Sequence, residues 1–253
     1  MCQLLAMNCN VPTDIAFSFE GFRRRGGQTD QHGDGWGIGF FEDDGWRVFL
    51  DHLPSATSPV AEFIRNYPIK SHNVVAHIRK ATQGKVSLAN THPFRRELWG
   101  EEWLFAHNGN LADFTYHGTR FQAIGNTDSE QAFCLLLDQL AERFPTKPAH
   151  GELAHEFARI AGSLTTYGTF NCLLAVGRQL YTHCSTQLHY LVRQAPFSTA
   201  HLKDADVSID FSRHTTPDDR VAIIATLPLT DNECWSAFQS GEVACFEDGS
   251  RVL

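Results

Sequence analysis

The sequence contains no uninterrupted apolar stretch near the roughly 20 residues that a membrane-spanning helix needs. The first ten residues also lack a basic segment ahead of an apolar one, so a secretory signal is not expected. Long basic runs are missing as well, and the one short cluster, Arg23 to Arg25, is interpreted as part of a solvated loop. Acidic residues outnumber basic residues by 29 to 21, a net charge of −8. This balance argues against nucleic acid and anionic membrane surfaces as partners.

Neither a C-x-x-C nor an H-E-x-x-H motif occurs among the 7 cysteines and 13 histidines. The cysteines are scattered and odd in number, which is typical of buried thiols in a reducing compartment rather than of a disulfide framework. We therefore expect a cytoplasmic protein without a metal site.

The 253 residues, of which 42% are hydrophobic and 20% charged, are sufficient for a large hydrophobic core. We found no internal repeat and no long linker, so a single domain over residues 1–253 is the simplest partition. The first half of the chain is rich in glycine and also contains strand-like runs. Residues 40–50 read as a hairpin around the turn at 42–45, and residues 74–78 and 103–106 read as buried strands.

Two helices are predicted in the middle of the chain. One begins at Asp128, where apolar residues recur at spacings of three and four, and Thr127 with Glu130 forms a capping box at its start. The second covers residues 151–164. Strands follow at 170–176, 180–183, 189–192 and 221–225. Strands, two helices and strands again indicate an α+β protein rather than an alternating doubly wound sheet.

Cys2 is the most informative single position. Removal of Met1, which a small second residue favours, would give Cys2 a free α-amine beside its thiol. The amine has a reference pKa of roughly 7.7–8.0 and the thiol of about 8.5. One residue would then supply a nucleophile and a general base, although many proteins have a small second residue without any such role.

Five short motifs follow Cys2 in order: GDGWG at 33–37, HIRKAT at 77–82, NTHPF at 90–94, HNGN at 107–110 and GNTDSE at 125–130. Together they resemble the class II glutamine amidotransferase family, whose domain begins with the catalytic cysteine. The most similar members stand alone, without the synthase module of fused relatives. The resemblance implies a four-layer αββα sandwich of the N-terminal nucleophile (Ntn) hydrolase type.

By the same resemblance, Cys2 attacks the side-chain amide of glutamine, and ammonia leaves from a γ-glutamyl thioester. The Asn108 side-chain amide and the Gly109 N–H would then stabilise the oxyanion. An Asn-Gly pair also predicts a type I′ turn, and we expect that geometry here. This half-reaction needs no cofactor.

The resemblance also implies a glutamine pocket. Arg79 would bind the substrate α-carboxylate and Asp128 the α-ammonium, while Thr82 and His92 would line the pocket. Each residue has a simpler alternative: a structural ion pair for Arg79, helix-dipole stabilisation for Asp128, and ordinary packing for Thr82 and His92.

The glycine run at 33–39 reads as a turn entering a strand rather than a phosphate loop, and Asp34 is expected to have a structural hydrogen-bonding role. Since no synthase module fits in the 253 residues, a separate enzyme is the expected ammonia acceptor. Two alternatives keep the same pocket: a hydrolase of γ-glutamyl amides or peptides, and a non-catalytic regulatory subunit. The sequence gives no oligomeric state.

Overall fold

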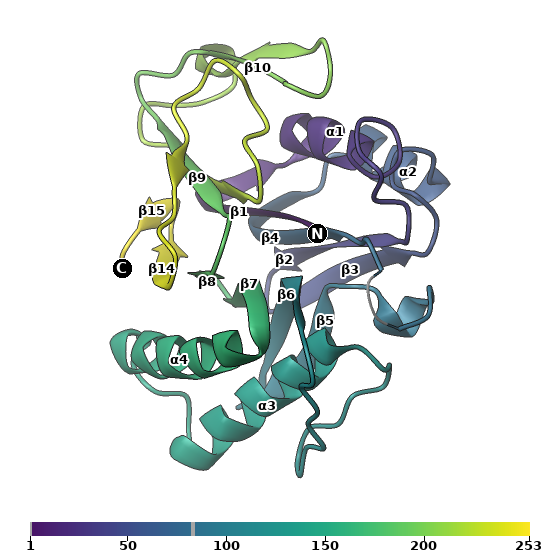
Figure 1. Cartoon of the computed structure of the whole chain (residues 1–253). Helices are drawn as coiled ribbons and strands as arrows, with labels where there is room; N and C mark the ends of the chain where they lie inside the picture. The colour runs from purple at the N-terminus through teal and green to yellow at the C-terminus, as the bar shows by residue number, and fades with distance from the viewer. Residues whose placement is uncertain (1, 82–83) are drawn as a thin grey trace.

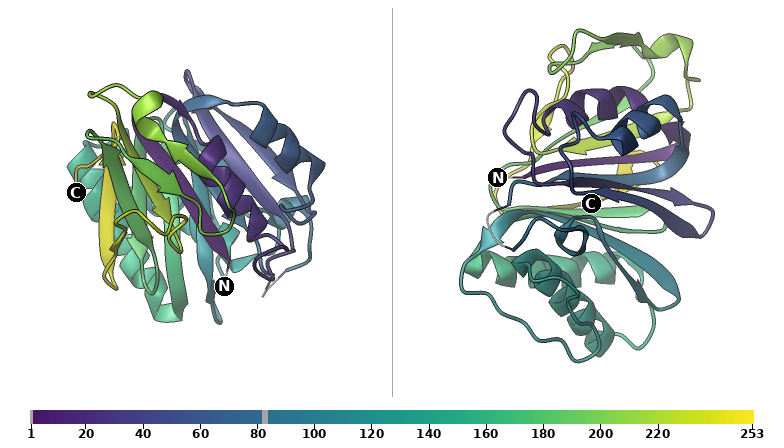
Figure 2. Two further views of the ribbon diagram at one scale, coloured as in Figure 1. Left: turned by 90° about the horizontal axis from the view of Figure 1, so that it is seen from above. Right: turned by 90° about the vertical axis from the view of Figure 1, so that its right-hand side faces the viewer.

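The computed structural model describes residues 2–81 and 84–253, which form two stacked antiparallel sheets between two layers of helices (Figures 1 and 2). Helices α1 (Ala16–Arg24) and α2 (Pro59–Asn66) cover the outer face of one sheet. Helices α3 (Asp128–Arg143) and α4 (His150–Leu164) cover the outer face of the other. The expected α+β class and four-layer αββα sandwich are confirmed.

Within the described chain, the first sheet has seven strands in the order β13-β9-β12-β1-β4-β2-β3. Their bounds are β13 (Ser236–Ala237), β9 (His189–Gln194), β12 (Arg220–Ala225), β1 (Gln3–Asp14), β4 (Lys70–Ile78), β2 (Trp36–Glu42) and β3 (Gly45–Asp51).

The second sheet, counted over the same residues, has six strands in the order β15-β14-β8-β7-β6-β5. Their bounds are β15 (Ser250–Arg251), β14 (Glu242–Glu247), β8 (Gln179–Cys184), β7 (Gly168–Val176), β6 (Glu101–Leu111) and β5 (Phe94–Leu98). A small ribbon of β10 (Thr199–His201) and β11 (Ser208–Asp210) lies beyond α1 in Figure 1. Short 3₁₀ turns occur at Leu88–Asn90, Thr165–Tyr167 and Phe211–Arg213.

Strand β1 explains why the two sheets stack. Leu5 and Met7 pack toward α1 and α2, whereas Leu4 and Ala6 pack into the layer between the sheets. Side chains alternate along a strand, so a strand that is apolar at successive positions must be covered on both faces. Fully burying each large apolar side chain contributes about 1.5–3 kcal/mol.

The predicted hairpin is confirmed as β2 and β3, with Glu42 paired to Gly45 across a two-residue turn. The second predicted helix begins one residue earlier than expected, at His150, and all the predicted strands are present. Helices α1 and α2, however, were not predicted from the sequence. Ser58, which accepts a hydrogen bond from the Ala61 N–H, and Pro59 in the first turn are the start signals that would have located α2.

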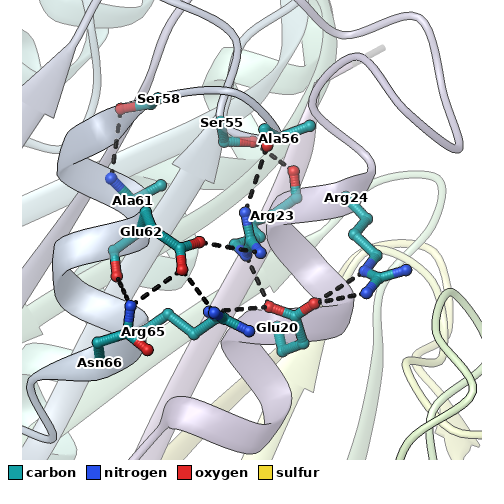
Figure 3. A network of polar contacts seen from close by, with 10 residues as sticks. All are labelled: Glu20, Arg23, Arg24, Ser55, Ala56, Ser58, Ala61, Glu62, Arg65 and Asn66. Atoms are coloured by element: carbon teal, nitrogen blue, oxygen red, sulfur yellow. Dashed lines mark hydrogen bonds and ion pairs between the residues drawn. The ribbon is translucent and has the colours of Figure 1, made fainter.

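The interpretation of Arg23 to Arg25 as a solvated loop is wrong. Arg23 and Arg24 end helix α1, and both donate to the Glu20 carboxylate, at 2.7 and 2.8 Å (Figure 3). Arg23 also reaches Glu62 of α2 at 3.4 Å, which joins the two helices. Arg23 and Arg24 lie three and four residues after Glu20, so all three charged side chains share one face of α1.

Arg25 is buried rather than solvated. Its guanidinium pairs with Asp204 at 2.8 Å and donates to the carbonyl oxygens of Leu227 and Pro228, at 3.0 and 2.7 Å. It also lies 3.4 Å from the side-chain oxygen of Gln3, beside Cys2. A buried guanidinium requires this many partners because its charge is costly to desolvate.

All the cysteines in the described chain are free. None of the helices described is both long and apolar enough to cross a membrane.

Candidate active site

Cys2 lies directly before β1, and its thiol is buried. The backbone N–H of Lys80 donates a hydrogen bond to Sγ at 3.3 Å, and Sγ lies 3.5 Å from the Lys80 carbonyl oxygen. Burial raises the pKa of the thiol, while the Lys80 N–H and the Arg79 charge oppose that rise. Because the net direction is upward, the thiol is protonated at neutral pH and needs a base before it can attack.

Arg79 is the first residue after β4, the strand that neighbours β1. Gln3 pairs with Ile78, and this register places Arg79 beside Cys2. The side chain is only 3% exposed, and its guanidinium donates to the carbonyl oxygens of Lys85 and Gly84 at 3.0 and 3.4 Å. Burial lowers the pKa of Arg79, and the nearby Cys2 and Asp128 partly offset that effect.

The GDGWG segment supports this corner of the site. The Arg79 N–H donates to the carbonyl of Gly35 at 2.8 Å, and the Asp34 N–H donates to the carbonyl of Arg79 at 3.2 Å. The Asp34 carboxylate accepts from the Ala81 N–H at 2.8 Å, which is the expected structural role. Gly35 has φ +108°, a conformation that favours glycine, and the run then enters β2 as predicted.

Asn108 and Gly109 lie inside β6, paired with Asn171 and Phe170 of β7, so the expected type I′ turn is wrong. Long-range pairing with β7 overrides the local preference of the Asn-Gly dipeptide. A side chain at Gly109 would collide with the carbonyl oxygen of Thr169, so the glycine permits close strand contact instead of a turn.

The Asn108 side chain is fully buried. Its Nδ2 donates to the Thr226 hydroxyl at 3.3 Å, and its Oδ1 has no hydrogen-bond partner among the described residues. The Thr226 hydroxyl also accepts from the Leu4 N–H at 2.9 Å, which ties the amide to the strand that follows Cys2. The sequence carries no local signal for Thr226, which β12 brings beside β1 from 222 residues away.

Asp128 opens helix α3, as predicted, and is buried. Its carboxylate accepts from the Leu111 N–H at the end of β6 at 2.7 Å and from the Ser129 N–H at 2.8 Å. The negative charge of Asp128 also raises the pKa of the Cys2 thiol, after the larger effect of burial. The carboxylate occupies the first turn of α3, where a negative charge stabilises the helix dipole.

The predicted capping box is half formed. Thr127 accepts from the Glu130 N–H at 3.2 Å, as expected. The Glu130 carboxylate does not return the bond but accepts from Ile124 and Gly125 N–H groups and pairs with Arg96 at 2.5 Å. Glu130 therefore shapes the loop ahead of the helix.

His92 is buried, with its ring 4.2 Å from the His77 ring and 4.3 Å from the Phe94 ring. No nitrogen of either imidazole has a hydrogen-bond partner in the described part of the chain, although the His107 backbone lies near His77. Burial lowers the pKa of both rings, that of His77 to about 3. His107 is buried and bonded to Ser129 and Thr169. Thr82, the remaining predicted pocket residue, lies outside the described residues.

One thiol, one guanidinium, one carboxylate and one carboxamide thus come from the residue before β1, the residue after β4, the start of α3 and strand β6. A positive and a negative side chain that both act electrostatically on the thiol suit the two charges of an amino-acid group. Among the described residues, no group of three or more His, Cys, Asp or Glu could hold a metal ion.

A buried cysteine at the start of a central strand, in an αββα sandwich, defines the class of Ntn-type folds. A sequence model of the family "Glutamine amidotransferases class-II" matches residues 1–253. The chain therefore belongs to the class II glutamine amidotransferase family, and the resemblance drawn from the motifs is confirmed.

The chain is 51% identical to "Putative glutamine amidotransferase YafJ" of Escherichia coli over 255 residues, covering 100% of both chains. It superposes on the crystal structure of a "predicted glutamine amidotransferase" from Pseudomonas aeruginosa with a TM-score of 0.81, at 45% identity and 100% coverage of both chains. The glutamine phosphoribosylpyrophosphate amidotransferase of B. subtilis shares only the fold: its TM-score is 0.53 at 14% identity, over 99% of this chain and 48% of that one.

Proposed function

We propose that the protein releases ammonia from the side-chain amide of glutamine through a γ-glutamyl thioester on Cys2. The observation that carries the proposal is the placement of the Cys2 sulfur against the Lys80 backbone, directly after Arg79, with the Asn108 amide linked to the same strand. Membership of the class II family supports the glutamine amidotransferase class of activity.

In this proposal, removal of Met1 gives Cys2 a free α-amine in addition to its thiol. Its α-amine takes the thiol proton, and the sulfur attacks the amide carbon of glutamine. The protonated amine then gives its proton to the leaving nitrogen, so that ammonia departs and the thioester remains. Water, deprotonated by the same amine, hydrolyses the thioester to glutamate and the free thiol. Such a base is required because burial raises the pKa of the Cys2 thiol.

Asn108 and Gly109 are assigned to the oxyanion. The Nδ2 of Asn108 and the Gly109 N–H are donors of the kind that stabilise a tetrahedral intermediate, and they act strongly because the site is buried. Arg79 and Asp128 are assigned to the α-carboxylate and the α-ammonium of the substrate. The two side chains carry opposite charges and both act electrostatically on the thiol, which supports that assignment. His92 and Thr82 are assigned to the lining of the glutamine pocket.

Residues 1–253 act as one domain in this proposal, in the cytoplasm, and a separate enzyme consumes the ammonia. The free cysteines are compatible with a reducing compartment.

The experiment is a substrate screen of the purified protein after intact-mass measurement. Loss of one methionine is expected, and glutamate should then form from glutamine. Full activity in a protein that retains Met1 would exclude the α-amine as the base. Turnover of γ-glutamyl amides or dipeptides without turnover of glutamine would favour the hydrolase alternative. Glutamine binding without any turnover would favour the regulatory subunit.

A further inference from the structure

Thr226 follows β12 and is buried, 3% exposed. Its N–H donates to the carbonyl of Leu4 at 3.1 Å, which continues the antiparallel pairing of β12 with β1. The Thr226 carbonyl, however, accepts from Nδ1 of His189 at 2.9 Å. The Leu4 N–H donates instead to the Thr226 hydroxyl, at 2.9 Å. The Thr226 hydroxyl thus accepts the hydrogen bond from β1 that a backbone carbonyl accepts in a regular antiparallel pair.

The same hydroxyl contacts the second sheet. It accepts from Nδ2 of Asn108 at 3.3 Å, so a single oxygen bonds both the strand that follows Cys2 and the carboxamide of β6. A hydroxyl has two acceptor sites, and both are occupied here. A carboxamide has two N–H groups in one plane, so the bond to Thr226 uses one N–H and fixes the direction of the other.

We propose that Thr226 is a positioning residue that orients the Asn108 carboxamide toward the oxyanion formed at Cys2. This inference rests on the proposed function, in which Asn108 is an oxyanion donor. The hydroxyl holds one N–H of the amide and leaves the second for the oxyanion. Because it also bonds Leu4, two residues after Cys2, it sets the spacing between nucleophile and donor. A donor fixed before the reaction needs no reorganisation as charge develops.

The segment after Thr226 is held in turn by Arg25. The Arg25 guanidinium donates to the carbonyl oxygens of Leu227 and Pro228 and pairs with Asp204. The hydroxyl is therefore carried by an anchored backbone, which is what a positioning role requires.

The test compares Thr226→Val, which removes the hydroxyl at nearly constant volume, with Thr226→Ser, which keeps it. The valine variant should lower kcat roughly three- to tenfold, the range expected for loss of one hydrogen bond, with KM for glutamine changed by less than about twofold. The serine variant should restore kcat. Thr182→Val is the matched control, because Thr182 is also buried but its hydroxyl donates to the Ala244 carbonyl. That control should leave kcat unchanged.

A double variant separates positioning from general destabilisation. If Thr226 acts through Asn108, adding Thr226→Val to Asn108→Ala should lower kcat no further. If the fold-decrease in kcat of the double variant equalled the product of the two single-variant decreases, the proposal would be overturned. An unchanged kcat in Thr226→Val would overturn it too. Circular dichroism verifies folding, and Thr226→Ala, which cannot overpack, replaces the valine variant if that one unfolds.

A measurement that is independent of turnover distinguishes this inference from the proposed function. The ¹⁵N–¹H signals of the Asn108 carboxamide are assigned by their loss in Asn108→Ala. They should shift in Thr226→Val and stay near their original positions in Thr226→Ser and Thr182→Val. Unshifted signals in the valine variant would overturn the inference. If the wild-type protein turned over neither glutamine nor γ-glutamyl amides, the proposed function would fail, and the amide signals would still decide the role of Thr226.

Discussion

The Lys80 N–H donates a hydrogen bond to the Cys2 sulfur across 3.3 Å, from the residue that directly follows Arg79. The end of β4 therefore carries the guanidinium and also holds the thiol in place. Because Gln3 and Ile78 pair in the sheet, this contact is fixed by strand register rather than by a loop. A shift of register by one residue would turn the thiol to the opposite face of the sheet.

Replacement of Cys2 should separate binding from chemistry. Cys2→Ala is expected to abolish glutamate formation while leaving glutamine affinity largely unchanged, because the proposed thiol acts only in the reaction. Cys2→Ser should also be severely impaired, since an alkoxide is harder to form than a thiolate. The measurements are turnover of glutamine and calorimetric binding of glutamine.

Cys234→Ala is the matched control, because Cys234 is the exposed cysteine of the described chain. It should be as active as the wild type. Residual turnover in Cys2→Ala comparable to that of the control would exclude Cys2 as the nucleophile.

Asn108→Ala should lower kcat by roughly 10²–10³, the usual loss for one oxyanion donor, with a smaller effect on KM. The Thr226 hydroxyl, which accepts from Asn108, keeps its bond to the Leu4 N–H in this variant, so the fold should tolerate the change. A rise in KM with kcat unchanged would instead place Asn108 in substrate binding.

Local patterns predicted much of the fold. Helix α3 follows from its apolar spacing and the Thr127 cap, and the β2–β3 hairpin follows from a turn between apolar runs. Helix α1 has nine residues, including a glycine, too few for its periodicity to stand out. The burial of Arg25 could not be read locally, since Asp204 and Leu227, its partners, lie about 180 and 200 residues away.

In the site, too, local motifs predicted some features, whereas others depend on contacts between distant parts of the chain. The motifs located Arg79 and Asp128, and the charges of both shift the pKa of the Cys2 thiol in the folded protein. The Asn-Gly pair predicted a turn because a dipeptide shows only local preferences, whereas the pairing of β6 with β7 decides its conformation. Thr226 was not found because its contact with Asn108 depends on both sheets being assembled.

His77 should make stability depend on pH. Burial lowers its pKa from 6.5 to about 3, so the folded protein keeps the ring neutral where the unfolded chain would protonate it. The contribution of the neutral His77 ring to the free energy of unfolding is therefore fully present above about pH 6.5, and it is lost as the pH falls toward 3. In urea unfolding, the stability gap between wild type and His77→Gln should narrow by about 2 kcal/mol between pH 7.5 and pH 5. An equal gap at both pH values would contradict a buried neutral His77.

The last prediction concerns the charges of the glutamyl group. Arg79→Ala and Asp128→Asn should each lower kcat/KM at least tenfold, mainly through weaker binding, since an unmatched desolvated charge costs about 2–5 kcal/mol. Asparagine is used because Asp128 also accepts from the Leu111 N–H, and alanine would release that end of β6.

Substrate analogues identify which charge each residue meets. The α-methyl ester of glutamine should bind weakly to the wild type and little more weakly to Arg79→Ala, because that variant has already lost the interaction. N-acetylglutamine should behave in the same way toward Asp128→Asn. The crossed combinations, ester with Asp128→Asn and acetyl with Arg79→Ala, are the controls and should be additive, since they remove different contacts. If the matched combinations proved additive as well, neither residue would touch the charge assigned to it. Asp128 would then serve only the start of α3 and the end of β6.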